Sequence, residues 1–154
     1  MLRRLFAVLI VGVFFLPVPA VATASPDDVQ VRIDQILERY PGGVQISENA
    51  VAWDDGDVLL TLNSGLAATT RGSVGKCANG KFCVFSNAGG SGSSLSFSTC
   101  GVKDVSPLGA PVRSIANARS SGSVTAKNGS STVLTVAAGK RVNTTKTVTT
   151  VQCN

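Results

Sequence analysis

The chain has 154 residues, of which 15% are charged, and its formal net charge is +5. It contains no histidine, and the residues from Arg71 to the end hold a single acid, Asp104. General acid–base catalysis needs a suitably poised titratable group within an interacting set of side chains, so this composition argues against an enzyme. We therefore expect a non-catalytic protein that needs no cofactor.

The first 24 residues have the pattern of a secretory signal peptide. Arg3 and Arg4 precede an apolar run at 5–16, and Ala22-Thr23-Ala24 offers a small-residue cleavage site. The run is too short to span a bilayer, which takes about 20 apolar residues. An uncleaved membrane anchor is the alternative. We predict a signal peptide over 1–24, a secreted extracellular protein and no transmembrane segment after cleavage.

An acidic segment over residues 25–62 opens with a predicted helix. Ser25 can cap this helix, Pro26 suits its first turn, and two aspartates follow at its positive end. Apolar residues then recur at helical spacing on one face, at Val29, Ile33, Ile36, Leu37 and Tyr40. A Pro-Gly-Gly sequence ends the helix. We interpret the apolar face as a docking surface rather than a cofactor site.

A β-hairpin is predicted after the helix. Apolar runs at 44–46, 50–53 and 57–62 have the lengths of strands, and Asp54-Asp55-Gly56 separates the last two. An Asp-Gly pair between apolar runs is typical of a hairpin turn. Three aspartates in four residues also suggest a calcium loop, but the twelve-residue calcium motif has another spacing and a closing glutamate. We therefore expect a solvated turn.

The composition changes at residues 63–75, which are rich in Gly, Ser, Ala and Thr and lack periodicity. We predict a linker there and a separate β domain over residues 76–154. Six short strands are expected in this domain, at 82–85, 94–99, 112–118, 123–127, 132–137 and 147–153. Their frequent turn signals favour a sandwich or a Greek-key barrel.

The β domain also contains a weak internal repeat. The surroundings of Val84, Leu95 and Ile115 are followed, roughly forty residues later, by similar surroundings at Val124, Leu134 and Val151. Two related β units that pack face to face would produce this pattern.

The two halves of the chain carry opposite charge. Residues 25–70 hold eight acids and two bases, a net charge of −6, whereas residues 71–154 hold ten bases and one acid, a net charge of +9. Two interpretations stay open. Either each half is separately solvated and the basic half attracts anionic envelope polymers, or the acidic segment docks on the basic domain and covers part of it.

Four cysteines lie in the second half of the chain, at Cys77, Cys83, Cys100 and Cys153. An even number of cysteines in a small exported protein indicates disulfides, and without histidine the wide spacing from Cys77 to Cys83 does not suit a zinc site. Four cysteines allow three pairings. A hairpin over 82–99 would bring the residues preceding it close to Cys100, so we predict Cys77–Cys100 with Cys83–Cys153.

Part of the chain resembles a known family. Residues 77–85, CANGKFCVF, resemble the opening of bacterial secreted peptidase inhibitors of the Streptomyces metalloproteinase inhibitor type. The glycine turn at 87–90, Leu95-Ser96-Phe97 and Cys100 match the strand pattern that follows in this family, and the segment from Pro41 onward looks like actinobacterial relatives.

The resemblance implies a βγ-crystallin-like Greek-key sandwich stapled by disulfides, with inhibition of a thermolysin-like metalloprotease as its activity. The calcium motif of related crystallin-like domains falls on residues 109–114, which lack acid and amide ligands. Because calcium needs several oxygen ligands, we expect no metal at this position.

The loop over residues 101–111 is the candidate for contact with the protease. Two prolines stiffen it, and a rigid loop lowers the entropy cost of binding. Its apolar side chains, of the kind that the resemblance implies for thermolysin-like targets, are Val102, Val105 and Leu108. The alternative is a connection tucked under the sheet. We predict a peptidase inhibitor that presents this disulfide-supported loop to an extracellular protease.

A basic module that binds the cell envelope is the alternative function, since a charge of +9 would attract an anionic envelope polymer. Binders of single-stranded nucleic acid stack aromatic side chains on bases. After the linker only Phe82, Phe85 and Phe97 remain, and all three look like core residues. We therefore expect a monomer with no specific nucleic-acid partner.

Overall fold

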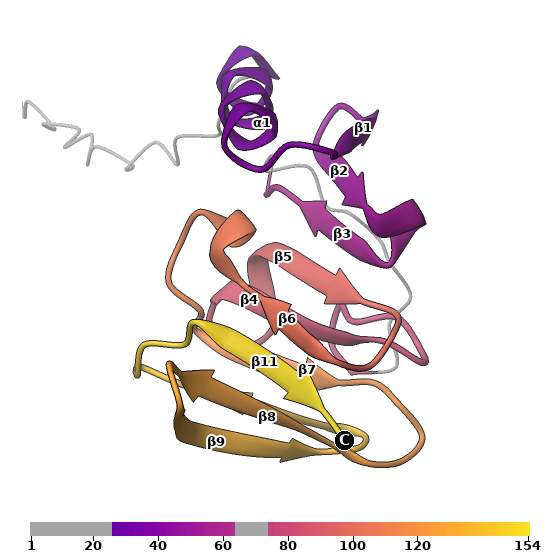
Figure 1. Ribbon diagram of the computed structural model, residues 1–154, viewed down its shortest axis with the longest axis vertical. Helices are drawn as coiled ribbons and strands as arrows, with labels where there is room; N and C mark the ends of the chain where they lie inside the picture. Colours follow the sequence, from indigo (N-terminus) through magenta and orange to yellow (C-terminus); the bar gives the residue numbers. More distant parts are fainter. Residues whose placement is uncertain (1–25, 64–73) are drawn as a thin grey trace, which may run out of the picture.

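The computed structural model describes residues 26–63 and 74–154, so the predicted signal peptide and most of the predicted linker lie outside the described residues. One helix, α1 (Pro26–Arg39), precedes two antiparallel sheets (Figure 1). The strands are β1 (Val44–Ser47), β2 (Ala50–Trp53), β3 (Val58–Thr61), β4 (Phe82–Asn87), β5 (Ser91–Phe97), β6 (Val102–Asp104), β7 (Ser114–Asn117), β8 (Ser123–Asn128), β9 (Ser131–Ala137), β10 (Lys140–Asn143) and β11 (Thr150–Cys153). The predicted all-β sandwich with an N-terminal helix is confirmed.

The larger sheet has seven strands in the order β1-β2-β3-β5-β4-β7-β10. The predicted Asp-Gly hairpin is present in it as β2 and β3, joined by the 3-10 turn η1 (Asp54–Gly56). The sheet continues because β3 pairs with β5, which places Leu60 opposite Leu95, and both side chains are fully buried. The acidic segment therefore docks on the later β region through sheet pairing and apolar burial.

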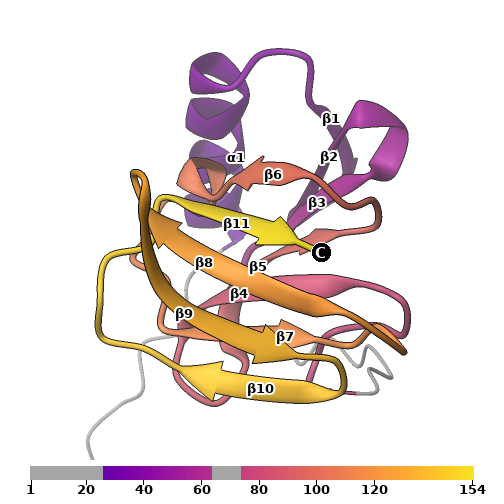
Figure 2. The same ribbon diagram turned by 60° about the horizontal axis from the view of Figure 1, so that its bottom comes forward.

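The smaller sheet has four strands in the order β6-β11-β8-β9. The two units of the internal repeat lie on different sheets, with β4, β5 and β7 in the larger one and β8, β9 and β11 in the smaller one. Their side chains meet in one core cluster, which includes Val84, Leu95, Ile115, Val124 and Val151. Figure 2 shows β8 and β9 lying over the larger sheet.

The strand prediction missed β6 and β10. The first is three residues long and reads Val-Lys-Asp, and the second reads Lys-Arg-Val-Asn, so neither shows an alternation long enough to detect. Each lies at a sheet edge and pairs with one neighbour, β6 with β11 and β10 with β7. Both strands therefore depend on tertiary pairing rather than on local sequence preference.

The helix packs onto the sandwich with its predicted apolar face. Its buried residues, all part of the main core cluster, are Val29, Ile33 and Ile36. The indole Nε1 of Trp53 donates a 3.0 Å hydrogen bond to the carbonyl of Tyr40 and ties the helix end to β2. Gly43 is required at this approach because a Cβ there would lie 2.6 Å from the Trp53 ring. Within the described residues, no helix is long and apolar enough to cross a membrane.

Candidate functional site

The structure pairs Cys77 with Cys83 and Cys100 with Cys153. The predicted pairing, Cys77–Cys100 with Cys83–Cys153, is wrong. The chain ahead of β4 does not continue alongside the β4–β5 hairpin. It turns back toward β7, where the amide of Gly80 donates a 2.9 Å hydrogen bond to the carbonyl of the residue after that strand. Cys77 is thereby buried on the face of the larger sheet that carries Cys83.

The three residues predicted to contact a protease lie in different environments. Val102 is 63% exposed, whereas Val105 is 5% exposed and Leu108 is fully buried. The reason is the 3-10 turn η2 (Ser106–Leu108), which packs against β5 and inserts its last side chain into the core. Val105 and Leu108 are buried, so they correspond to the alternative, a connection tucked under the sheet, and only Val102 presents its side chain to solvent.

The exposed surface beside the second disulfide consists of residues 98–102, which we call the cystine loop. All five residues are exposed; the first four connect β5 to β6, and Val102 is the first residue of β6. Cys100 ties the middle of the loop to Cys153 at the end of β11. Gly101 follows with a φ of 136°, a backbone conformation that favours glycine. The loop thus presents Val102 on a backbone that is anchored immediately before it.

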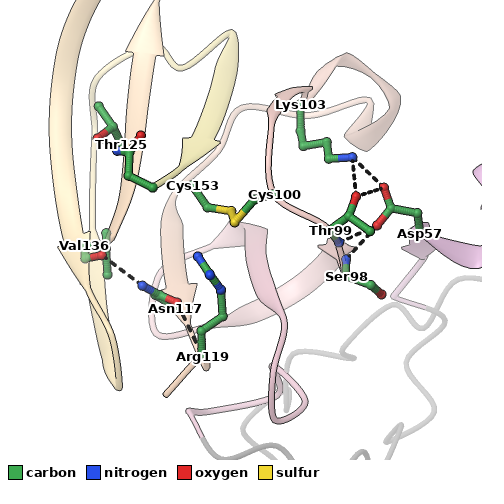
Figure 3. Close-up of a disulfide and its surroundings, with 11 residues drawn as sticks. Asp57, Ser98, Thr99, Cys100, Lys103, Asn117, Arg119, Thr125, Val136 and Cys153 are labelled. Carbon is green, nitrogen blue, oxygen red and sulfur yellow. Dashed lines mark hydrogen bonds and ion pairs between the residues drawn. A yellow bond between two sulfur atoms is a disulfide. The ribbon is translucent and has the colours of Figure 1, made fainter. Parts of the chain in front are cut away.

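One carboxylate holds the cystine loop from the other side. Oδ1 of Asp57 accepts hydrogen bonds from the amides of Ser98 at 3.1 Å and Thr99 at 2.6 Å. Its Oδ2 accepts from the hydroxyl of Thr99 at 2.7 Å and from Nζ of Lys103 at 2.5 Å (Figure 3). Hydrogen bonds to a charged group are stronger than neutral ones. We call this arrangement the Asp57 clamp, and it fixes the loop on both sides of Cys100.

The clamp changes the acidity of Asp57. Burial acts to raise the pKa of the carboxyl group, but the hydrogen bonds from Lys103 and Thr99 outweigh burial and lower the pKa from 3.8 to about 2. The folded protein therefore stabilises the ionised form. Because the folded pKa is depressed, this stabilisation is complete only above the unfolded value of 3.8 and is lost as the pH falls through about 2.

We expect Asp57→Asn to lower the free energy of unfolding at pH 7 by roughly 2 kcal/mol, because Lys103 loses its carboxylate and the loop amides lose a charged acceptor. The difference from wild type should shrink near pH 2, where about half of the wild-type Asp57 carboxyl groups in the folded protein are themselves protonated. Urea unfolding at the two pH values measures both effects. Asp55→Asn, in the exposed hairpin turn, is the matched control and should change little. An equal loss for Asp57→Asn at pH 2 and pH 7 would contradict the role of charge.

The residues of the Asp57 clamp were not among the predicted site residues. Asp57 lies 46 positions before Lys103 in the sequence, so no local spacing connects them. The only signal was the group of three aspartates after β2. Two of these form the exposed turn, as predicted, and the third is the acceptor that organises the cystine loop.

The site contains one exposed aliphatic side chain, a disulfide and a charged clamp on neighbouring elements. Within residues 26–63 and 74–154, no group of three or more cysteine, aspartate or glutamate side chains could hold a metal ion. Comparison of the chain with protein-family models, with curated proteins and with solved structures finds no match.

Proposed function

We propose that this protein is a secreted inhibitor of an extracellular peptidase and that the cystine loop is the part that binds the active site. The observation that carries the proposal is the position of Val102. It is 63% exposed, although it directly follows a backbone held by the Cys100–Cys153 bridge and by the Asp57 clamp. An exposed apolar side chain on a fixed backbone is what a specificity pocket can bind at low entropic cost.

The backbone of the loop also suits a protease. Val102 begins β6, which is extended and lies at the edge of the smaller sheet, where it pairs only with β11. A free strand edge can add a further strand through main-chain hydrogen bonds, with side-chain pockets supplying specificity. The extended stretch at Val102 can therefore dock along the substrate-binding cleft of a peptidase.

A thermolysin-like metalloprotease is the target class that we favour. Its preference for apolar side chains fits an exposed valine, and the resemblance of residues 77–85 to the Streptomyces metalloproteinase inhibitor type points to the same class. The signal-peptide pattern over 1–24 and the two disulfides support secretion into an oxidising environment, where the target would be met.

Titration of residual peptidase activity tests the proposal. A thermolysin-like metalloprotease, a subtilisin and a trypsin are each assayed against increasing amounts of the mature protein. We expect stoichiometric inhibition of the metalloprotease. Protein that has been reduced and alkylated beforehand is the control and should inhibit far less, because the loop loses its anchor. Full activity of all three enzymes at a large molar excess would overturn the inhibitor proposal.

Binding to an anionic envelope polymer is the second candidate function. Four exposed basic residues lie on or beside β7 and β10, and none of them forms an ion pair with the described residues; they are Arg113, Lys140, Arg141 and Lys146. Exposed cations on neighbouring segments attract polyanions, most strongly at low ionic strength. Salt-sensitive binding to a polyphosphate without any peptidase inhibition would favour this function over the first.

A further inference from the structure

The two disulfides differ in their accessibility to solvent. Cys77 and Cys83 are both buried, at 0% and 2% exposure, and are packed with the apolar residues on the outer face of the larger sheet. In the second bridge, Cys100 is exposed while Cys153 is buried. Thiol–disulfide exchange requires access of a thiolate to one sulfur. Only the second bridge has an exposed cysteine, so a thiolate from solvent can approach it at Cys100.

A partly buried cation, Arg119, lies beside this second bridge. The side chain of Arg119 extends from the end of β7 toward the Cys100–Cys153 pair (Figure 3). The surroundings of Gly122 also place the Arg119 side chain near the end of β11. A Cβ added at Gly122 would meet the carbonyl oxygen of Asn154 and would lie 3.6 Å from Nη1 of Arg119. The arginine backbone is held in place because its amide donates a 3.3 Å hydrogen bond to the side chain of Asn117.

The Arg119 guanidinium is incompletely satisfied. Its Nη1 is buried and has no hydrogen-bond partner among the described residues. Buried polar groups are nearly always paired, so an unpaired guanidinium nitrogen needs an explanation. A neighbouring cation favours the thiolate form of cysteine, and reduction of the bridge would create such an anion next to it.

We propose that Cys100–Cys153 is a thiol–disulfide exchange site for a dithiol reductant and that Arg119 assists its opening. One thiolate of the reductant attacks Sγ of Cys100, the bond between the two protein sulfurs breaks, and Cys153 leaves as a thiolate beside Arg119. The second thiolate of the reductant then attacks the reductant sulfur that is bonded to Cys100. This closes the disulfide of the reductant and releases Cys100 as a thiolate. The reductant is oxidised to its disulfide, two electrons pass to the bridge, and the two cysteine thiolates take up the two protons. The Cys77–Cys83 bridge stays closed.

Opening of the bridge removes the covalent anchor of the cystine loop. The hydrogen bonds of the Asp57 clamp then remain to hold the loop. The exchange chemistry does not depend on the proposed function. Only the effect of bridge opening on inhibition rests on the proposed function. The experiments therefore measure the exchange reaction at the sulfur atoms directly. A failed inhibition assay and a failed exchange assay are then distinguishable.

The first experiment compares the two bridges within one molecule. The mature protein is treated with dithiothreitol, samples are alkylated at timed intervals, and peptide mapping by mass spectrometry locates the label. We expect Cys100 and Cys153 to be labelled at least about tenfold faster than Cys77 and Cys83. Glutathione, a monothiol, should form its trapped adduct on Cys100. Equal rates for the two bridges, or an adduct on Cys153, would overturn the proposal.

The second experiment tests Arg119. We expect Arg119→Gln to slow opening of the Cys100–Cys153 bridge about threefold, because the leaving thiolate loses its cation. Arg119→Lys keeps the charge and should restore most of the rate, and Arg113→Gln, an exposed arginine elsewhere, is the matched control. Circular dichroism confirms that each variant is folded. If folded Arg119→Gln opened the Cys100–Cys153 bridge at the wild-type rate, the role of Arg119 would be refuted. The exchange site itself is tested without any variant, by the order in which the two bridges of the wild-type protein open.

Discussion

Replacing Leu108 with alanine is expected to lower the free energy of unfolding by about 3 kcal/mol. The side chain is fully buried in the main core cluster, where the turn η2 inserts it against β5. Truncation removes its apolar contacts and leaves a cavity that the two sheets cannot fill without moving. Urea or thermal unfolding, followed by circular dichroism, measures the loss.

Val102→Ala is the matched control for this result. Both substitutions shorten an aliphatic side chain in the same connection, but Val102 is 63% exposed. Its truncation should change the free energy of unfolding by less than about 0.5 kcal/mol. Similar stability losses for Leu108→Ala and Val102→Ala would contradict the division of this segment into a buried turn and an exposed loop.

Val102→Asp should weaken inhibition of the target peptidase at least about 100-fold while the protein stays folded. An apolar specificity pocket would have to bury an unpaired carboxylate in place of an isopropyl group, and that desolvation is unfavourable. The inhibition constant against the metalloprotease measures the effect, and the unfolding midpoint reports that the fold is intact.

Val142→Asp provides the control for the loss of inhibition. Val142 is also an exposed valine on an edge strand, at 38% exposure, but it lies on β10 in the other sheet. The same change of charge there should leave inhibition unaltered. If Val102→Asp and Val142→Asp inhibit equally well, the cystine loop is not the contact surface.

The elements that follow local rules were predictable from the sequence. The helix has a proline in its first turn and an apolar face, and the structure forms it over Pro26–Arg39. The Asp-Gly turn correctly predicted the β2–β3 hairpin. Strand β5 alternates serine with Leu95 and Phe97, and its burial alternates in the same way. Each of these signals depends on neighbours within one element.

The candidate site was predicted less well because long-range packing organises it. The sequence predicts a single loop over residues 101–111, yet Val102 faces solvent and Leu108 lies in the core. Apolar residues in an irregular segment have no periodicity that could show which side chains are buried and which are exposed. The disulfide pairing failed for a related reason, since the path of the chain ahead of β4 is set by its contact with β7.

Because β3 pairs with β5, the covalent link between β3 and β4 is not what holds the acidic segment in place. Both disulfides lie within residues 77–153, so no cystine joins the acidic segment to the rest of the chain across the part of this link that precedes Cys77. A single cut between β3 and Cys77 would leave two polypeptides in one particle, and the shorter fragment would supply β3 as the strand that pairs with β5 of the longer one. Removal of the donor would expose the edge of β5 and the buried side chain of Leu95, a surface suited to self-association. The acidic segment is thus a structural part of the sheet that covers the edge of β5.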